Sequence, residues 1–144
     1  MTETQKNTKC PVCGNYKNRD VSNDAIIEID GNILLIKRGK DPYKDFWALP
    51  GGHVEFDETV EESVAREVKE ETGLDVISLK LFGVYSNPER HPKQTVAVAY
   101  LVKTKGEIIA GDDASDFKLF SKDEIPDILA FDHKEILDDY LKKS

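Results

Sequence analysis

The sequence predicts an α/β fold with a mixed sheet between helices, and two observations support this class. Short apolar stretches separated by turn residues predict strands at residues 25–29, 33–37, 46–49, 76–86, 95–103 and 117–120. Two other segments repeat apolar residues at helical spacing, one ending before Gly73 and one beginning after Asp132. A chain of 144 residues without an internal repeat or a linker suits one domain.

Residues 1–20 are polar and are predicted to form a short extension before a main domain of residues 21–144. Cys10 and Cys13, in the sequence CPVCG, have the spacing of half a zinc ribbon. Because the chain has no second cysteine pair, we do not expect a zinc site within one chain. A vestigial knuckle and a zinc site shared between two chains are the alternatives. The extension lacks the apolar centre of a signal peptide, so we expect a cytoplasmic protein.

The first two predicted strands form a hairpin, since Asp30-Gly31-Asn32 between them is a typical turn sequence. Residues 46–49 then form a short strand that leads into the glycine turn of residues 49–52. Phe46 and Trp47 have two interpretations. They pack in the core, as large aromatic side chains usually do, or they form a wall on which a base stacks.

The segment after this turn reads GHVEFDETVEESVAREVKEETGL and predicts a helix with both ends marked. Thr59 and Glu62 fit a capping box at its start, and Gly73 fits a left-handed cap at its end. One face of the helix carries an apolar stripe, which consists of Val60, Val64, Ala65 and Val68.

Glu67, Glu70 and Glu71 stand at positions i, i+3 and i+4, so their carboxylates share the other face within one turn. Carboxylates this close repel one another, and a hard divalent cation such as Mg²⁺, or alternatively Mn²⁺, removes the conflict. A solvated acidic face is the alternative interpretation. The metal site is preferred because the turn, the cap, the stripe and the cluster occur together.

The same segment resembles the Nudix hydrolase signature, G-x5-E-x7-R-E-U-x-E-E-x-G-U, in which U is a bulky aliphatic residue. Its fixed positions are filled by Gly52, Glu58, Arg66, Glu67, Val68, Glu70, Glu71, Gly73 and Leu74. The resemblance implies a Nudix-type α/β/α sandwich and Mg²⁺-dependent hydrolysis of a nucleoside diphosphate linked to another group. It implies that Glu67, Glu70 and Glu71 hold the metal ions with the Gly51 carbonyl, and that Glu70, Glu71 and Arg66 are catalytic.

The later segments complete the sheet and supply the last candidates. Residues 76–86 and 95–103 are predicted long strands joined by the loop NPERHPK, residues 87–93. Asp112 and Asp113, in the acidic turn GDDASD, are either a later metal ligand or base, or part of a solvated turn. Residues 121–125 are a predicted helical turn. The final helix is predicted to bury Ile136, Leu137, Tyr140 and Leu141.

The net charge of −8 argues against binding to nucleic acid or to an anionic membrane, so we expect a small nucleotide as the partner. The sequence leaves a homodimer open. The candidate substrate-binding residues are Arg38, Trp47, Gly52, Glu58, Arg90 and Lys93, with Tyr85 and Phe120 as further rings for stacking.

The loop of residues 87–93 and the sequence FDHKEIL from Phe131 resemble the ADP-ribose pyrophosphatase branch of the family. The resemblance therefore favours ADP-ribose as the substrate, with AMP and ribose 5-phosphate as products. A nucleoside triphosphate pyrophosphatase of the housecleaning type is one alternative. A Nudix sensor that binds a nucleotide without cleaving it is another.

Overall fold

The computed structural model describes residues 9–15, 18–109 and 114–143, with the side chains of residues 114 and 115 excepted. Its strands are β1 (Val21–Ile29), β2 (Asn32–Arg38), β3 (Trp47–Ala48), β4 (Gly51–His53), β5 (Asp75–Tyr85), β6 (Val96–Lys105) and β7 (Ala114–Ser121). Its helices are α2 (Val60–Thr72), the short 3₁₀ helix η1 (Pro88–Arg90) and α3 (His133–Lys143). No described helix is long and apolar enough to cross a membrane.

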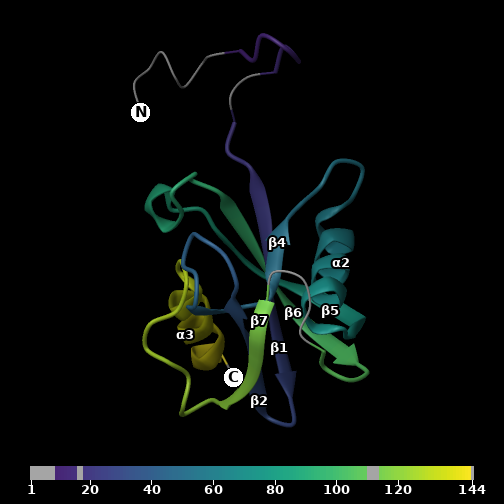
Figure 1. Ribbon diagram of the computed structural model, residues 1–144, viewed down its shortest axis with the longest axis vertical. Helices are drawn as coiled ribbons and strands as arrows, with labels where there is room; N and C mark the ends of the chain where they lie inside the picture. Colours follow the sequence, from purple (N-terminus) through teal and green to yellow (C-terminus); the bar gives the residue numbers. More distant parts are fainter. Residues whose placement is uncertain (1–8, 16–17, 110–113, 144) are drawn as a thin grey trace.

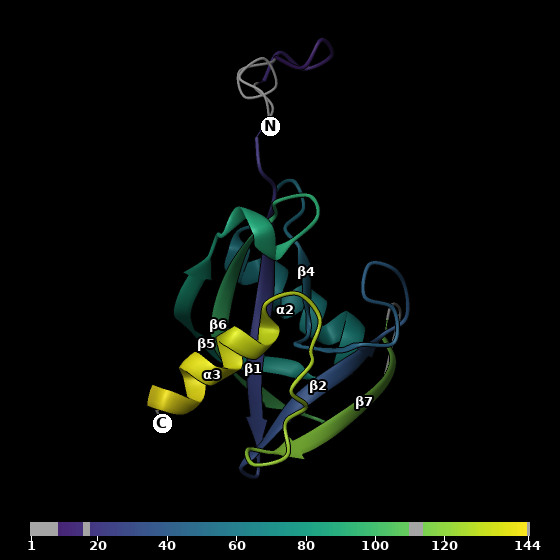
Figure 2. The same cartoon turned by 90° about the vertical axis from the view of Figure 1, so that its left-hand side faces the viewer.

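The strands form a mixed sheet in the order β3-β2-β1-β6-β5, with β4 paired to β1 and β7 paired to β2. The strands β1 and β6 run parallel, whereas β2 runs antiparallel to both β1 and β7. Helices α2 and α3 cover opposite faces of this sheet (Figure 1). Figure 2 shows α3 lying across the face that is turned away from α2. The predicted sandwich with a mixed central sheet is confirmed.

Alternation along β1 divides the core into two clusters, because successive side chains of a strand point to opposite faces. Ala25 and Ile27 pack with Val64 on the α2 side of the sheet. Ile26 packs with Ile136 on the α3 side. All five side chains are at most 2% exposed, and each fully buried Val or Ile contributes about 1.5–3 kcal/mol relative to an exposed one.

Both predicted ends of α2 are confirmed. The Thr59 hydroxyl accepts a hydrogen bond from the Glu62 N–H at 3.0 Å, and the Glu62 carboxylate accepts one from the Thr59 N–H at 2.8 Å. Gly73 takes the left-handed conformation, with φ of 77°, and ends the helix. These caps satisfy backbone groups at both ends of the helix and fix where it begins and ends.

Other elements differ from the prediction. The strand β1 begins at Val21 rather than at residue 25, because Asn23 and Asp24 pair with β4 on one side and β6 on the other. The predicted helical turn at residues 121–125 is a hydrogen-bonded turn that belongs to no helix. In α3, Tyr140 and Leu141 are half-buried rather than buried.

Candidate active site

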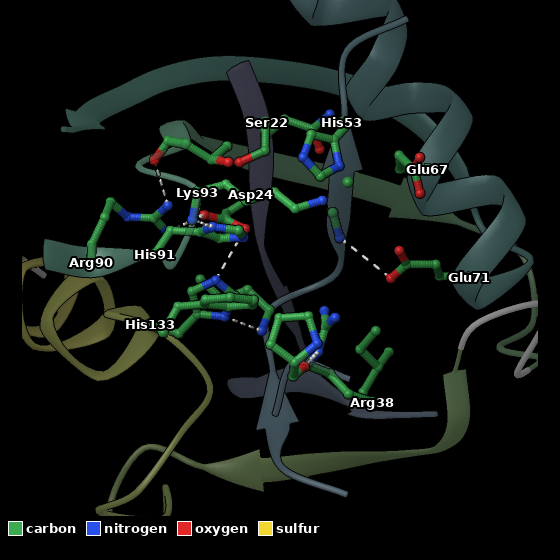
Figure 3. A pocket seen from close by; sticks show the side chains of 18 of the residues that line it. Ser22, Asp24, Arg38, His53, Glu67, Glu71, Arg90, His91, Lys93 and His133 are labelled. Carbon is green, nitrogen blue, oxygen red and sulfur yellow. Dashed lines mark hydrogen bonds and ion pairs between the residues drawn. The ribbon is translucent and has the colours of Figure 1, made fainter. Parts of the chain in front are cut away.

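A cleft of about 640 Å³ opens beside the glycine turn, between α2 and three loops, which follow β2, precede β6 and precede α3. Figure 3 shows Glu67 and Glu71 on one side of this cleft, and Arg90, His91 and Lys93 on the other. Its volume lies within the range of about 300–1,000 Å³ that is usual for small-molecule sites. The cleft therefore has an acidic wall on the signature helix and a basic wall on the loops.

Glu71 is the most buried carboxylate of the acidic wall, at 6% exposure. Its Oε2 accepts a hydrogen bond from the Gly51 N–H at 3.3 Å. Burial raises the pKa of Glu71 well above its usual value, and the neighbouring Glu67 carboxylate raises it further. Ionisation of both Glu67 and Glu71 in this buried position is unfavourable unless a positive charge lies near them.

The glycine turn leaves no room for side chains. A Cβ on Gly52 would lie 2.5 Å from the Glu67 carboxylate, and a Cβ on Gly51 would lie 2.0 Å from the Asn23 carbonyl oxygen. Both distances are shorter than any real contact of that kind. Gly52 therefore lets the turn approach the Glu67 carboxylate directly, and Gly51 lets it approach the backbone of β1.

Arg66 joins several groups behind the acidic wall. Its guanidinium donates two hydrogen bonds to Glu58, at 2.8 and 3.0 Å, and one to Glu67 at 2.7 Å. It also contacts Glu70 at 3.2 Å and the carbonyl of His53 at 3.0 Å. Hydrogen bonding to Glu58 raises the pKa of Arg66, and the same pair lowers the pKa of Glu58. Arg66 is therefore charged and held in place.

The three predicted metal ligands of the helix do not converge. Among the described residues, no three acidic, imidazole or thiol groups lie close enough together to hold one ion. Glu67 and Glu71 meet inside the cleft, whereas Glu70 is 42% exposed and is paired with Arg66. Asp112 and Asp113 lie outside the described residues. The paired carboxylates beside the bare glycine backbone nevertheless fit a divalent cation, which prefers several oxygen ligands and would supply the missing counter-charge.

The ring of Phe131 stands in the wall opposite the carboxylates. His91 stacks on it with 4.9 Å between ring centroids and 7° between planes, and Tyr43 contacts it edge-on at 4.7 Å. The Arg38 guanidinium lies 5.1 Å from the ring centroid. Phe131 takes a φ of 53°, a conformation that few non-glycine residues adopt. Both Phe131 and His91 line the cleft.

The predicted basic residues differ in what they offer to a ligand. Arg38 and Lys93 line the cleft. Arg90 also lines it, but its side chain is 3% exposed and donates to the Asp132 carboxylate and to the Thr95 carbonyl. Arg90 is thus engaged within the protein, and its role as a substrate ligand stays a prediction.

The rings of Trp47, Tyr85 and Phe46 do not line the cleft, and the core interpretation of Trp47 is confirmed. Trp47 lies outside the cleft and packs edge-on against Phe120 in the core, with centroids 5.3 Å apart. Tyr85 donates its hydroxyl to Asp139 of α3 at 2.7 Å, away from the cleft. Phe46 is 38% exposed and contacts Tyr43, so it belongs to the surface. Trp47 and Tyr85 thus contact partners far along the chain, which local sequence could not reveal, whereas Phe46 contacts a ring close to it in sequence.

The predicted residues that line the cleft on this side are Gly52, Glu67 and Glu71. Glu58 does not line the cleft and is connected to it only through its hydrogen bonds to Arg66. Asp24 and His133 also line the cleft, and the sequence alone predicts no role for either of them. A signal for Asp24 was present, since a carboxylate directly before a run of apolar strand residues is an unusual position.

Comparisons with known proteins agree with this geometry. The NUDIX domain family matches residues 19–140. The ADP-ribose pyrophosphatase of Methanocaldococcus jannaschii is 47% identical over 129 residues, which cover 88% of this chain and 76% of that protein. The NUDIX domain of Shewanella oneidensis NrtR was solved in complex with ADP ribose. It matches this chain with a TM-score of 0.78 at 25% identity, and the match covers 99% of each chain.

A further solved structure is that of a bifunctional NMN adenylyltransferase/ADP ribose pyrophosphatase from Francisella tularensis, complexed with AMP and a manganese ion. It has a TM-score of 0.75 at 31% identity, over 89% of this chain and 42% of that chain. The fold and the signature helix on its cleft define a Nudix hydrolase. This chain belongs to the Nudix family, and the resemblance inferred from its sequence is confirmed.

Proposed function

We propose that this chain hydrolyses ADP-ribose to AMP and ribose 5-phosphate with the help of Mg²⁺ or Mn²⁺. The observation that carries the proposal is the cleft itself, in which Glu67 and Glu71 face a basic and aromatic wall. A diphosphate that bridges two bulky groups needs both features. Cations balance its charge at the acidic wall, and polar or stacking groups hold its two arms.

Glu67, Glu71 and the carbonyl of Gly51 are the groups that would hold a cation, and Glu70 is the exposed carboxylate next to them. A bound cation neutralises charge on the diphosphate and acidifies a water molecule for attack. The fit rests on Glu71, whose buried carboxyl has a raised pKa beside Glu67. Asp112 and Asp113 remain predictions for a later ligand or base.

The chain's own residues have separate roles in this proposal. Arg66 holds the Glu67 carboxylate at 2.7 Å and so keeps it turned toward the cleft. Arg38 and Lys93 offer positive charge to the phosphates from the other wall. The stacked rings of Phe131 and His91 form an aromatic wall for the nucleobase, and base–aromatic stacking is worth about 1–3 kcal/mol.

Two relatives support ADP-ribose as the substrate. The M. jannaschii relative bears the name ADP-ribose pyrophosphatase, and the NrtR domain holds ADP ribose in its solved complex. A cleft with two unlike walls suits a molecule with two unlike arms. A nucleoside triphosphate would present one arm and additional negative charge.

Product analysis tests the proposal. The purified chain is incubated with ADP-ribose and Mg²⁺, and the products are separated by chromatography and identified by mass. We expect equimolar AMP and ribose 5-phosphate, with no product when EDTA replaces Mg²⁺. Binding of ADP-ribose without any product would instead assign the chain to the sensors. Cleavage of triphosphates but not of ADP-ribose would assign it to the housecleaning pyrophosphatases.

A further inference from the structure

Two adjacent polar residues, Asn23 and Asp24, lie inside β1 with only 0% and 5% of their surfaces exposed. Neighbouring side chains of a strand point to opposite faces, so these two approach different helices. The Asn23 amide donates to the Ser63 hydroxyl of α2 at 2.8 Å. The Asp24 Oδ1 lies 3.2 Å from Nε2 of His133, the first residue of α3. Because burying polar groups is unfavourable unless they are paired, their place in the middle of the sheet needs an explanation.

His133 connects Asp24 to the glycine turn. Its Nδ1 accepts a hydrogen bond from the Leu49 N–H at 2.9 Å, and its side chain is 4% exposed. An imidazole whose Nδ1 accepts must carry its proton on Nε2, where it can be donated to Asp24. The hydrogen bond from Leu49 therefore sets the tautomer of His133, with the Nε2 proton on the side of Asp24. In turn, His133 satisfies a backbone N–H that would otherwise be buried without a partner.

The hydrogen bond at Leu49 fixes the start of the turn that ends at the acidic wall. The carbonyl of Pro50 accepts a backbone hydrogen bond from β1 at 2.8 Å. The next N–H, that of Gly51, donates to Glu71 Oε2 at 3.3 Å. A continuous series of contacts thus leads from α3 through three backbone residues to the buried carboxylate on α2.

The remaining neighbours of Asp24 strengthen this connection. Among the described residues, its Oδ2 has no hydrogen-bond partner, and Arg90 Nη2 lies 4.0 Å away. Arg90 is itself held by two hydrogen bonds to Asp132, at 2.8 and 2.9 Å. The two oxygens of Asp24 thus face different groups, since Oδ1 faces the Nε2–H of His133 and Oδ2 faces the Arg90 guanidinium.

We propose that His133 and Asp24 are positioning residues for the proposed cation site. They set the place of residues 49–51, and through that turn the places of the Gly51 carbonyl and the Glu71 carboxylate. This inference rests on the proposed function. Because both nitrogens of His133 are used within the protein, neither is left for a substrate. Such outer partners of metal ligands typically change metal affinity or activity by about 10–100-fold when they are removed.

The test compares two replacements of His133. His133→Leu removes the hydrogen bond from Leu49 and the contact with Asp24, whereas His133→Asn keeps an acceptor near the position of Nδ1 for the Leu49 N–H. Mn²⁺ affinity is measured without substrate, from the electron paramagnetic resonance signal of free Mn²⁺. We expect His133→Leu to weaken Mn²⁺ binding by about tenfold and to lower kcat with little change in KM. We expect His133→Asn to restore most of both, and the Leu49 amide to exchange faster in His133→Leu.

The control is Tyr85→Phe, which removes another contact of α3, the hydrogen bond to Asp139, outside the cleft. It should leave Mn²⁺ binding and kcat unchanged. If His133→Leu loses its cooperative melting transition, Asp24→Ala carries the test, because it removes the partner of Nε2 and leaves the acceptor for Leu49 in place. Wild-type Mn²⁺ affinity in a folded His133→Leu or Asp24→Ala would overturn the proposal, as would a loss confined to KM. Because Mn²⁺ binding needs no substrate, a wrong substrate assignment would leave this test intact.

Discussion

Arg66 and Glu58 are joined by two hydrogen bonds, at 2.8 and 3.0 Å, behind the acidic wall of the cleft. Their side chains are only 23% and 14% exposed, so solvent screens the pair less than it screens a surface ion pair. The same guanidinium also donates to Glu67, the carboxylate that faces the cleft. Glu58 therefore acts on the site indirectly, because it holds Arg66 and Arg66 holds the Glu67 carboxylate.

The first prediction follows from this relationship. Glu58→Gln keeps the size of the side chain but removes its charge, which weakens the hydrogen bonds from Arg66. Arg66 should then hold the Glu67 carboxylate less firmly in its orientation toward the cleft. We expect kcat/KM for ADP-ribose to fall by about tenfold, because outer partners of metal ligands have effects of that order. Steady-state kinetics at saturating Mg²⁺ measure the change. Asp75→Asn, which removes an exposed ion pair with Lys69, is the matched control and should behave as wild type. Equal kinetics for both variants would refute the role of Glu58.

The second prediction concerns pH and the stability of the metal-free protein. Burial raises the pKa of Glu71 above its usual 4.5, so the folded protein binds this proton more tightly than the unfolded chain does. The resulting stabilisation is complete below pH 4.5 and is lost as the pH rises through the folded-state pKa. In EDTA, the melting temperature of Glu71→Gln should therefore fall less than that of wild type as the pH rises toward neutrality.

The same variant should respond differently to metal. Added Mg²⁺ is expected to raise the melting temperature of wild type at neutral pH and to have little effect on Glu71→Gln, because ligand binding stabilises only the protein that binds it. Glu124→Gln, on the exposed turn after β7, is the control and should follow wild type. Identical melting curves for wild type and Glu71→Gln across the pH range in EDTA would contradict the burial of a titrating carboxyl.

The third prediction concerns the exposed member of the signature cluster. Glu70 is paired with Arg66 but does not meet Glu67 and Glu71 in the cleft. If it joins them when the cation and substrate bind, Glu70→Gln should lower kcat by about 10² while the fold stays intact. Circular dichroism and steady-state rates measure the two properties. Near-normal turnover at saturating Mg²⁺ would remove Glu70 from the catalytic set.

The fourth prediction concerns the opposite wall. Phe131→Leu keeps an apolar side chain but removes the flat ring, so we expect KM for ADP-ribose to rise by about tenfold with a smaller effect on kcat. Phe82→Leu removes a ring that packs on Tyr140, outside the residues that line the cleft, and serves as the control. An unchanged KM in Phe131→Leu would show that the nucleobase does not lie on this ring.

The parts of the fold that sequence predicts well depend on neighbours along the chain. Thr59 and Gly73 mark the ends of α2 because capping involves residues within one turn, and both predictions are confirmed. Val64 and Val68 are buried as predicted, because helical spacing alone places them on one face. The same spacing predicts that Glu67 and Glu71 share a face, and these two carboxylates meet in the cleft, whereas Glu70 does not join them.

The rest of the site depends on contacts that span the chain. Trp47 could be a core ring or a cleft ring from sequence, and its contact with Phe120 of β7 decides the matter. The ring that lines the cleft is Phe131, which meets His91 only because the sheet brings the two loops together. The contact between Asp24 and His133 joins β1 to α3, and no local pattern encodes it.

The most direct test of the central claim is the ratio of two specificity constants. The purified chain is assayed at saturating Mg²⁺ with ADP-ribose and with each common nucleoside triphosphate, and kcat/KM is determined for all of them. The proposed function predicts that ADP-ribose exceeds every triphosphate by at least about tenfold, a difference of about 1.4 kcal/mol in transition-state stabilisation. A higher kcat/KM for any triphosphate, with a nucleoside monophosphate and pyrophosphate as its products, would contradict it.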